Sequence, residues 1–137
     1  MEQATLTILA VDPGRTKCGL AIVRRNEGVL TRAVVTKENL ARLLRVIFEQ
    51  FQPTVTVLGR GTGAKEIERL IRQIDGAPQI KMVDETYTSL DARQRFFREH
   101  PPKGLKRLIP TGLQTPDVPY DDYVAVILAE RYLETHI

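Results

Sequence analysis

The stretch Ile8-Leu-Ala-Val-Asp12-Pro-Gly-Arg-Thr-Lys-Cys-Gly19-Leu-Ala-Ile-Val23 decides the fold. It covers most of one short apolar run, 6–11, and all of a second, 19–23, and the Asp-Pro-Gly sequence after the first run is a strong turn signal. A third run of strand-forming residues spans 30–35. Three such runs joined by turns predict an antiparallel meander of three strands.

Helical and strand patterns alternate after the meander. Apolar residues at spacings of three and four predict helices at 37–51 and 64–74, and further helices are expected at 89–99 and 121–133. Short apolar runs at 55–58 and 80–83 predict two more strands. Because a helical crossover leads to each of these later strands, the first, fourth and fifth strands should run parallel. The sequence therefore predicts an α/β fold, with one mixed five-stranded sheet flanked by helices.

Length and composition exclude several classes of protein. The chain has 137 residues, of which 42% are hydrophobic and 27% charged. This predicts a single globular domain over residues 1–137 rather than a disordered chain. No apolar run reaches the ~18–20 residues of a membrane span, and no signal peptide is expected because no cleavage site follows the first short run. A single cysteine, Cys18, excludes an internal disulfide and suits a cytoplasmic protein.

Charge is distributed unevenly along the second half of the chain. The total of 20 Lys and Arg against 17 Asp and Glu gives a net charge of +3, which indicates a polyanionic partner only weakly. The stretch 92–108 holds one acid and six basic residues, namely Arg93, Arg95, Arg98, Lys103, Lys106 and Arg107. The stretch 109–137 holds five acids and one base. This pattern suits a site for phosphate and metal together, or an ordinary solvated helix face.

Carboxylates are expected to gather at one edge of the predicted sheet. Asp12 and Glu85 follow the first and fifth strands, and such sheets bind ligands outside the carboxyl ends of their parallel strands. The last helix begins at Asp121-Asp122 and would add a third carboxylate if it starts at the same edge. Clustered carboxylates with open positions suit a hard cation such as Mg²⁺ rather than zinc. Each acid also has an ordinary alternative: a turn residue, a surface residue or a helix cap.

A glycine-rich loop at 59–63 follows the fourth strand. Its backbone N–H groups could bind an anion at the start of the next helix. The loop lacks the Lys-Ser/Thr pair of a Walker A motif and the spacing of a dinucleotide fingerprint. We interpret it as a tight turn between strand and helix.

Three motifs, in order along the chain, resemble one known family. The segment 8–21, with its Asp-Pro-Gly turn and Gly19, is similar to the opening of the YqgF/RuvX proteins and of the RuvC Holliday-junction resolvases. The segment Val83-Asp84-Glu85-Thr-Tyr-Thr-Ser89 resembles the YqgF pattern. The segment Asp121-Asp-Tyr-Val-Ala-Val-Ile-Leu resembles the family's last motif, an Asp that heads an apolar helix. The stretch 101–110 does not map onto the best-known members.

The resemblance implies a ribonuclease H-like fold, a divalent-metal nuclease site and a nucleic-acid substrate. By position in the motifs, Asp12, Glu85 and Asp121 would be metal ligands, with Asp122 as a substitute for Asp121 or an addition to it. The family comparison implies either a resolvase of branched DNA or a nuclease that matures the precursor of 16S ribosomal RNA. It does not choose between these substrates.

Our leading hypothesis is a cytoplasmic endonuclease that depends on Mg²⁺ or Mn²⁺ and acts on structured DNA or RNA. Backbone phosphates would be bound by basic residues from two segments, namely Arg15, Lys17, Arg93, Arg95, Lys103, Lys106 and Arg107. A non-catalytic nucleic-acid-binding module with the same fold is the alternative. One lobe of a sugar-kinase or actin-like ATPase is disfavoured because that fold needs two lobes around the nucleotide. A resolvase that cuts a symmetric junction should form a homodimer.

Overall fold

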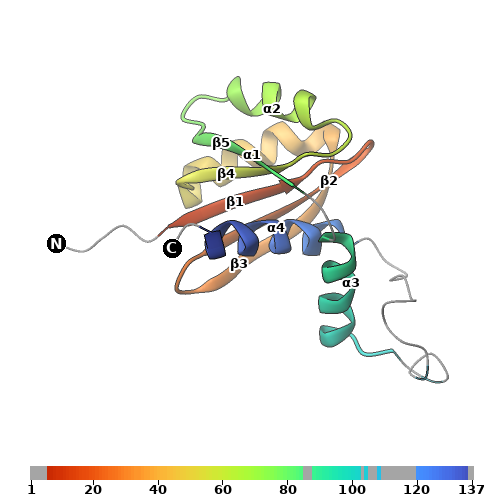
Figure 1. Cartoon of the computed structure of the whole chain (residues 1–137). Coiled ribbons are helices and arrows are strands. Elements are labelled where there is room, and N and C mark those ends of the chain that lie inside the picture. The colour runs from red at the N-terminus through yellow and green to blue at the C-terminus, as the bar shows by residue number, and fades with distance from the viewer. Residues whose placement is uncertain (1–5, 85–87, 103, 105–107, 109–119, 136–137) are drawn as a thin grey trace.

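The computed structural model describes residues 6–84, 88–102, 104, 108 and 120–135 of the chain. Within these residues, strands and helices follow one another in the predicted order (Figure 1). The strands are β1 (Thr7–Asp12), β2 (Lys17–Arg24), β3 (Gly28–Thr36), β4 (Val55–Gly59) and β5 (Gln79–Val83). The helices are α1 (Lys37–Phe51), α2 (Ala64–Arg72), α3 (Thr88–Glu99) and α4 (Asp121–Thr135).

The strands form one mixed sheet in the order β3-β2-β1-β4-β5. β2 pairs antiparallel with both β1 and β3, whereas β4 pairs parallel with both β1 and β5. The predicted meander and the predicted parallel strands are therefore confirmed. β1, β3, β4 and β5 all end at the same side of the sheet, where β2 begins. We call this side the carboxyl edge.

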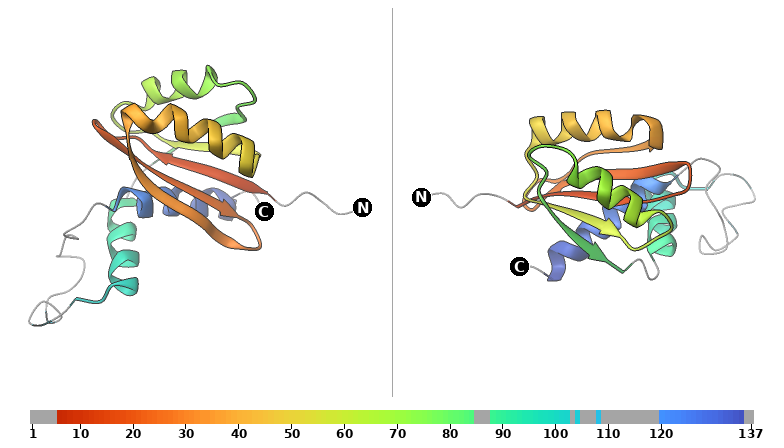
Figure 2. Two further views of the ribbon diagram at one scale, coloured as in Figure 1. Left: turned by 180° about the vertical axis from the view of Figure 1, so that it is seen from behind. Right: turned by 90° about the horizontal axis from the view of Figure 1, so that it is seen from above.

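The two faces of the sheet carry separate cores, because side chains of a strand alternate between its faces. Leu9 and Val11 of β1 belong to the core that α1 and α2 cover. Ile8 and Ala10 belong to the opposite core, which α4 covers together with α3. Figure 2 shows the two pairs of helices on opposite sides of the sheet. The same alternation places Asp12, the last residue of β1, on the α4 face.

α4 is buried more completely than an amphipathic surface helix. Every residue from 123 to 129 is buried. The helix packs across β1, β2, β3 and β4, and α3 packs against it as well. The sequence predicted only a short apolar face for this helix. More of the helix is buried than this face, because α3 covers part of the surface that does not contact the sheet. None of the helices in the described part of the chain has the length and apolar run needed to span a bilayer.

Element ends differ slightly from the predicted ones. β3 begins at Gly28, where a φ of +80° closes the turn from β2. α2 ends at Arg72 although its apolar spacing continues to Ile74. The Ile74 N–H donates to the Ile71 carbonyl at 3.1 Å, an i to i−3 bond typical of a tightened last turn. Ile74 therefore stays in the core without belonging to the α-helix.

Candidate functional site

Asp12 ends β1 at the carboxyl edge, and its side chain is half-buried. The chain then turns back sharply through Pro13 and Gly14 into β2. A Cβ on Gly14 would overlap the backbone carbonyl oxygen of Lys17, so the turn requires glycine. In the returning strand, Gly19 is the residue paired with Asp12.

The first residues of α4 lie directly against Gly19. A Cβ on Gly19 would overlap the backbone carbonyl of Asp121 and would lie 2.7 Å from the backbone nitrogen of Asp122. Any side chain at this position would therefore push the helix away from β2. Because Gly19 is also the partner of Asp12, the fold brings the end of β1 and the start of α4 together, as the sequence required for a shared site.

The pKa of the buried Cys18 thiol is affected by several charged groups at the carboxyl edge. Burial raises the pKa of this thiol, while the Gly14 backbone and the charge of Lys37 oppose the rise. The charges of Asp12 and Asp121 raise it further. The charges of Asp12 and Asp121 therefore act on the Cys18 thiol in the same direction.

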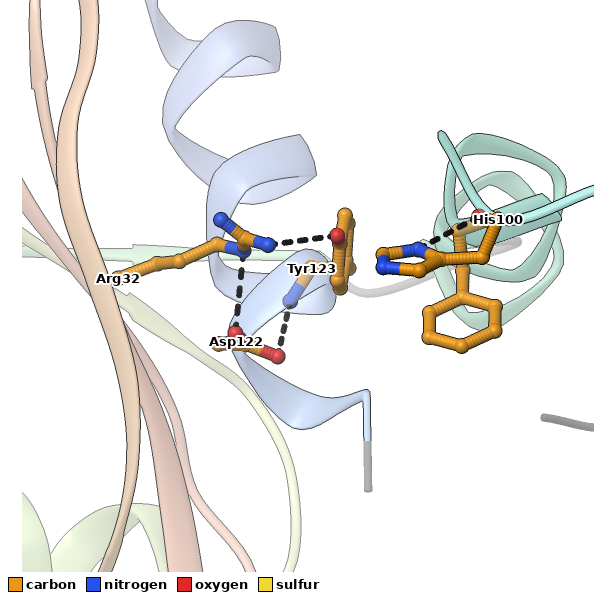
Figure 3. A network of polar contacts seen from close by, with 5 residues as sticks. Arg32, His100, Asp122 and Tyr123 are labelled. Carbon is orange, nitrogen blue, oxygen red and sulfur yellow. Dashed lines mark hydrogen bonds and ion pairs between the residues drawn. The ribbon is translucent and has the colours of Figure 1, made fainter. Parts of the chain in front are cut away.

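Asp122 is held by neighbours from two elements (Figure 3). Its Oδ2 forms an ion pair with Nε of Arg32 at 3.2 Å, and its Oδ1 accepts a hydrogen bond from the Tyr123 N–H at 3.1 Å. Burial raises the pKa of the Asp122 carboxyl above its usual value, although Arg32 and the Tyr123 N–H oppose the rise. Both oxygens of Asp122 are thus engaged, whereas no ion pair within the described residues engages Asp121.

Glu85, the third predicted ligand, lies outside the described residues. β5 ends at Val83, which packs against the α4 core, and exposed Asp84 follows it. Within residues 6–84, 88–102 and 120–135, no group of three or more His, Cys, Asp or Glu side chains is arranged to hold a metal ion. Asp12 and Asp121 supply two carboxylates, and oxygen donors of this kind fit Mg²⁺ or Mn²⁺. A site of three carboxylates would require Glu85.

The basic residues expected to bind phosphate have different surroundings. Arg15 and Lys17 are exposed in and beside the turn that follows Asp12. On α3, Nη1 of Arg95 contacts both carboxylate oxygens of Glu130, at 2.6 and 2.7 Å, so Arg95 joins α3 to α4. Nε of Arg93 is buried and has no hydrogen-bond partner among the described residues. The other three predicted residues, Lys103, Lys106 and Arg107, lie outside the described residues.

Two further cations lie at the carboxyl edge that the sequence analysis did not name. Lys37 begins α1, and its Nζ lies 3.6 Å from the position of a Cβ on Gly63 and 3.4 Å from Oε2 of Glu66. Arg60 is exposed in the 59–63 loop, and its N–H donates to the Val83 carbonyl at 3.0 Å. A signal for Lys37 was available, because β3 of the meander runs in the direction of β1 and also ends at this edge.

The 59–63 loop forms the tight turn that we expected. Gly63 has a φ of +85°, a conformation that glycine adopts without strain, and α2 begins at the next residue. The Ile67 N–H donates to the Gly63 carbonyl at 3.1 Å, so Gly63 already supplies the first carbonyl acceptor of the helix. The loop thereby places Arg60 and the start of α2 beside the Asp12 turn.

Comparisons with known proteins identify the fold. The structure of RuvC from Thermus thermophilus is similar with a TM-score of 0.58 and 13% identity, and the match covers 90% of each chain. YeaZ from Pseudomonas aeruginosa has a TM-score of 0.44 and 21% identity over 69% of this chain and 50% of that chain. No protein-family profile and no curated protein matches the sequence. The match to RuvC, together with the sheet order, shows that the chain has a RuvC-like fold of the ribonuclease H type.

Proposed function

We propose that this protein is a divalent-metal-dependent endonuclease that hydrolyses phosphodiester bonds of structured nucleic acid. The observation that carries the proposal is the contact of the α4 start with Gly19, the strand partner of Asp12. Asp12 and Asp121 would hold Mg²⁺ or Mn²⁺, with Glu85 as the third ligand. An ion bound there supplies an activated water and stabilises the leaving oxygen.

Basic residues around these acids would bind the phosphate backbone. Exposed cations lie on two segments of the carboxyl edge, namely Arg15 and Lys17 in and beside the Asp12 turn, and Arg60 in the 59–63 loop. Arg93 remains a candidate for the same role on α3, because its side chain is partly exposed and no ion pair with another described residue neutralises its charge. Arg95 is the weaker candidate because its charge is already paired with Glu130.

The substrate is proposed from the sequence resemblance. Membership of the YqgF/RuvX branch would favour the precursor of 16S ribosomal RNA, whereas a RuvC-type activity would favour four-way DNA junctions. Cleavage of a symmetric junction on two strands would require a homodimer. The free and buried thiol of Cys18 suits a reducing compartment such as the cytoplasm.

The test compares the wild type with Asp12→Asn on four-way DNA junctions and on precursor 16S ribosomal RNA, each with Mg²⁺. We expect the wild type to cut one substrate and Asp12→Asn to cut it at least ~100-fold more slowly, as when a group that stabilises developing charge is lost. Asp75→Asn is the matched control, because Asp75 is exposed after α2, at the opposite edge of the sheet.

Equal cleavage by the wild type and Asp12→Asn would exclude this metal site. Binding of nucleic acid without cleavage, unaffected by Asp12→Asn, would instead identify a non-catalytic binding module with the same fold.

A further inference from the structure

We propose that Arg32 is a positioning residue of the metal site. By holding Asp122, it would fix the rotation of α4 so that Asp121 is the aspartate presented to Asp12. The inference rests on the function proposed above, because it concerns the same metal ligands. It adds a residue that lies on β3, outside all three motifs of the sequence.

Arg32 connects β3 to the start of α4 through three contacts (Figure 3). Its Nε lies 3.2 Å from Oδ2 of Asp122. One terminal nitrogen donates to the Tyr123 hydroxyl at 2.6 Å, and the guanidinium carbon lies 4.4 Å from the centre of the Tyr123 ring. A planar guanidinium can make all of these contacts at once, which an ammonium group cannot.

The partners of Arg32 are themselves firmly held. The side chain of Asp122 is 15% exposed, and its other oxygen accepts the Tyr123 N–H. Tyr123 is buried, and its ring packs edge-on against Phe96 of α3 at a centroid distance of 5.7 Å. Arg32 therefore binds two side chains of α4 that other contacts already hold in place.

Two separate contacts fix the start of α4 on the sheet. Gly19 of β2 touches the backbone of Asp121 and Asp122, and Arg32 of β3 binds the Asp122 carboxylate. Consecutive residues of an α-helix point about 100° apart around its axis. For Asp122 to replace Asp121 at the metal, α4 would have to rotate about its axis by an angle of that size. The contacts of Arg32 with Asp122 and Tyr123 oppose this rotation. The choice between two adjacent aspartates thereby depends on a residue of another strand.

The experiment measures Mn²⁺ binding to the metal-free full chain by titration calorimetry. Loss of a group that orients a metal ligand typically lowers metal affinity about 10- to 100-fold. We expect Arg32→Gln and Asp122→Asn each to weaken Mn²⁺ binding about tenfold. The double variant should bind no more weakly than either single variant, because both changes break the same contact. Arg32→Lys should recover part of the affinity by restoring the ion pair.

Arg95→Gln is the matched control, since it removes another ion-paired arginine that contacts α4. It should lower the melting temperature without changing Mn²⁺ affinity. Affinities of Arg32→Gln and Arg32→Lys within twofold of the wild type, with Mn²⁺ binding abolished by Asp12→Asn, would overturn this inference and leave the proposed function standing. Unchanged Mn²⁺ binding in Asp12→Asn would overturn both.

Discussion

At the scale of single residues, Gly19 connects two acids from opposite ends of the chain. It pairs with Asp12 in the sheet and touches the backbone of Asp121 at the start of α4. Because glycine has no side chain, a strand and a helix can approach here until their backbones meet. The distance between the two acids is therefore set by a residue that carries no functional group.

Gly19→Ala should damage both stability and the site. The new Cβ would overlap the Asp121 carbonyl, and forcing an extra group into a packed contact costs about 1–3 kcal/mol of unfolding free energy. We expect a lower midpoint in urea unfolding together with weaker Mn²⁺ binding. Gly76→Ala, at a φ of +79° with open space around it, should lower stability alone. Wild-type Mn²⁺ affinity in Gly19→Ala would contradict the account.

Arg93 and Arg95 form a matched pair of neighbouring arginines on α3. Arg93 has a buried Nε without a partner among the described residues, whereas Arg95 is paired with Glu130. Arg93→Ala should weaken binding to junction DNA and reduce the slope of log affinity against log salt by about 1. Arg95→Ala should leave that slope unchanged and lower the unfolding free energy by about 0.5–1 kcal/mol. Fluorescence anisotropy at several salt concentrations measures the slopes, and equal slopes for the two variants would argue against the assignment.

Tyr123 should make stability depend on pH in the alkaline range. Burial raises the pKa of its hydroxyl above 10.0, a hydrogen bond to Glu99 raises it further, and Arg32 opposes the rise. Because the folded chain keeps this proton to higher pH than the unfolded chain, the stabilisation is complete below about pH 10 and is lost as pH rises through the folded pKa. Tyr123→Phe should lose less stability than the wild type between about pH 9 and about pH 11. Parallel urea titrations check this, and identical pH profiles would refute it.

The different surroundings of Asp121 and Asp122 show what the sequence could not predict at this scale. The two residues are adjacent, both follow the family pattern, and either one fits a helix start. Their difference arises from Arg32, which lies on β3 and is brought to α4 only by the complete fold. A contact between residues so far apart in sequence produces no periodicity or motif from which it could be predicted.

At the scale of elements, the sequence predicted the sheet well because connection rules restrict its topology. Turns force the meander to be antiparallel, and helical crossovers force β4 and β5 to run with β1. The residues at the carboxyl edge were predicted only in part, because the parallel strands are not the only strands that end there. β3 ends at the same edge, so Lys37 at the start of α1 belongs to the candidate site as well.

The packing of α3 was harder to predict from its sequence. The segment contains several arginines, which suggested a basic surface for nucleic acid. In the fold, Arg95 pairs with Glu130 and Arg131 of α4 pairs with Asp91 of α3 at 2.7 Å. Some charges of the basic segment are therefore paired with charges of the acidic segment. A count of charges along the sequence does not reveal such pairing.

At the scale of the whole molecule, the net charge of +3 says little about where a polyanion would bind. Arg60 is exposed at the carboxyl edge, whereas Arg72 is exposed at the end of α2, close to Glu68 at 3.9 Å. Substituting either arginine by alanine lowers the total charge equally. Arg60→Ala should reduce the salt slope of nucleic-acid binding by about 1, and Arg72→Ala should leave it unchanged. Equal effects in a filter-binding titration would mean that total charge, and not this edge, attracts the nucleic acid.

The central claim is that Asp12 and Asp121 hold a divalent metal ion at the carboxyl edge of the sheet. The most direct measurement is anomalous X-ray scattering from crystals soaked in Mn²⁺. We predict an anomalous peak at about 2.0–2.3 Å from carboxylate oxygens of both Asp12 and Asp121, with Asp122 still bound to Arg32. Data that show no peak between these two acids, or a peak on Asp122 in place of Asp121, would contradict the account.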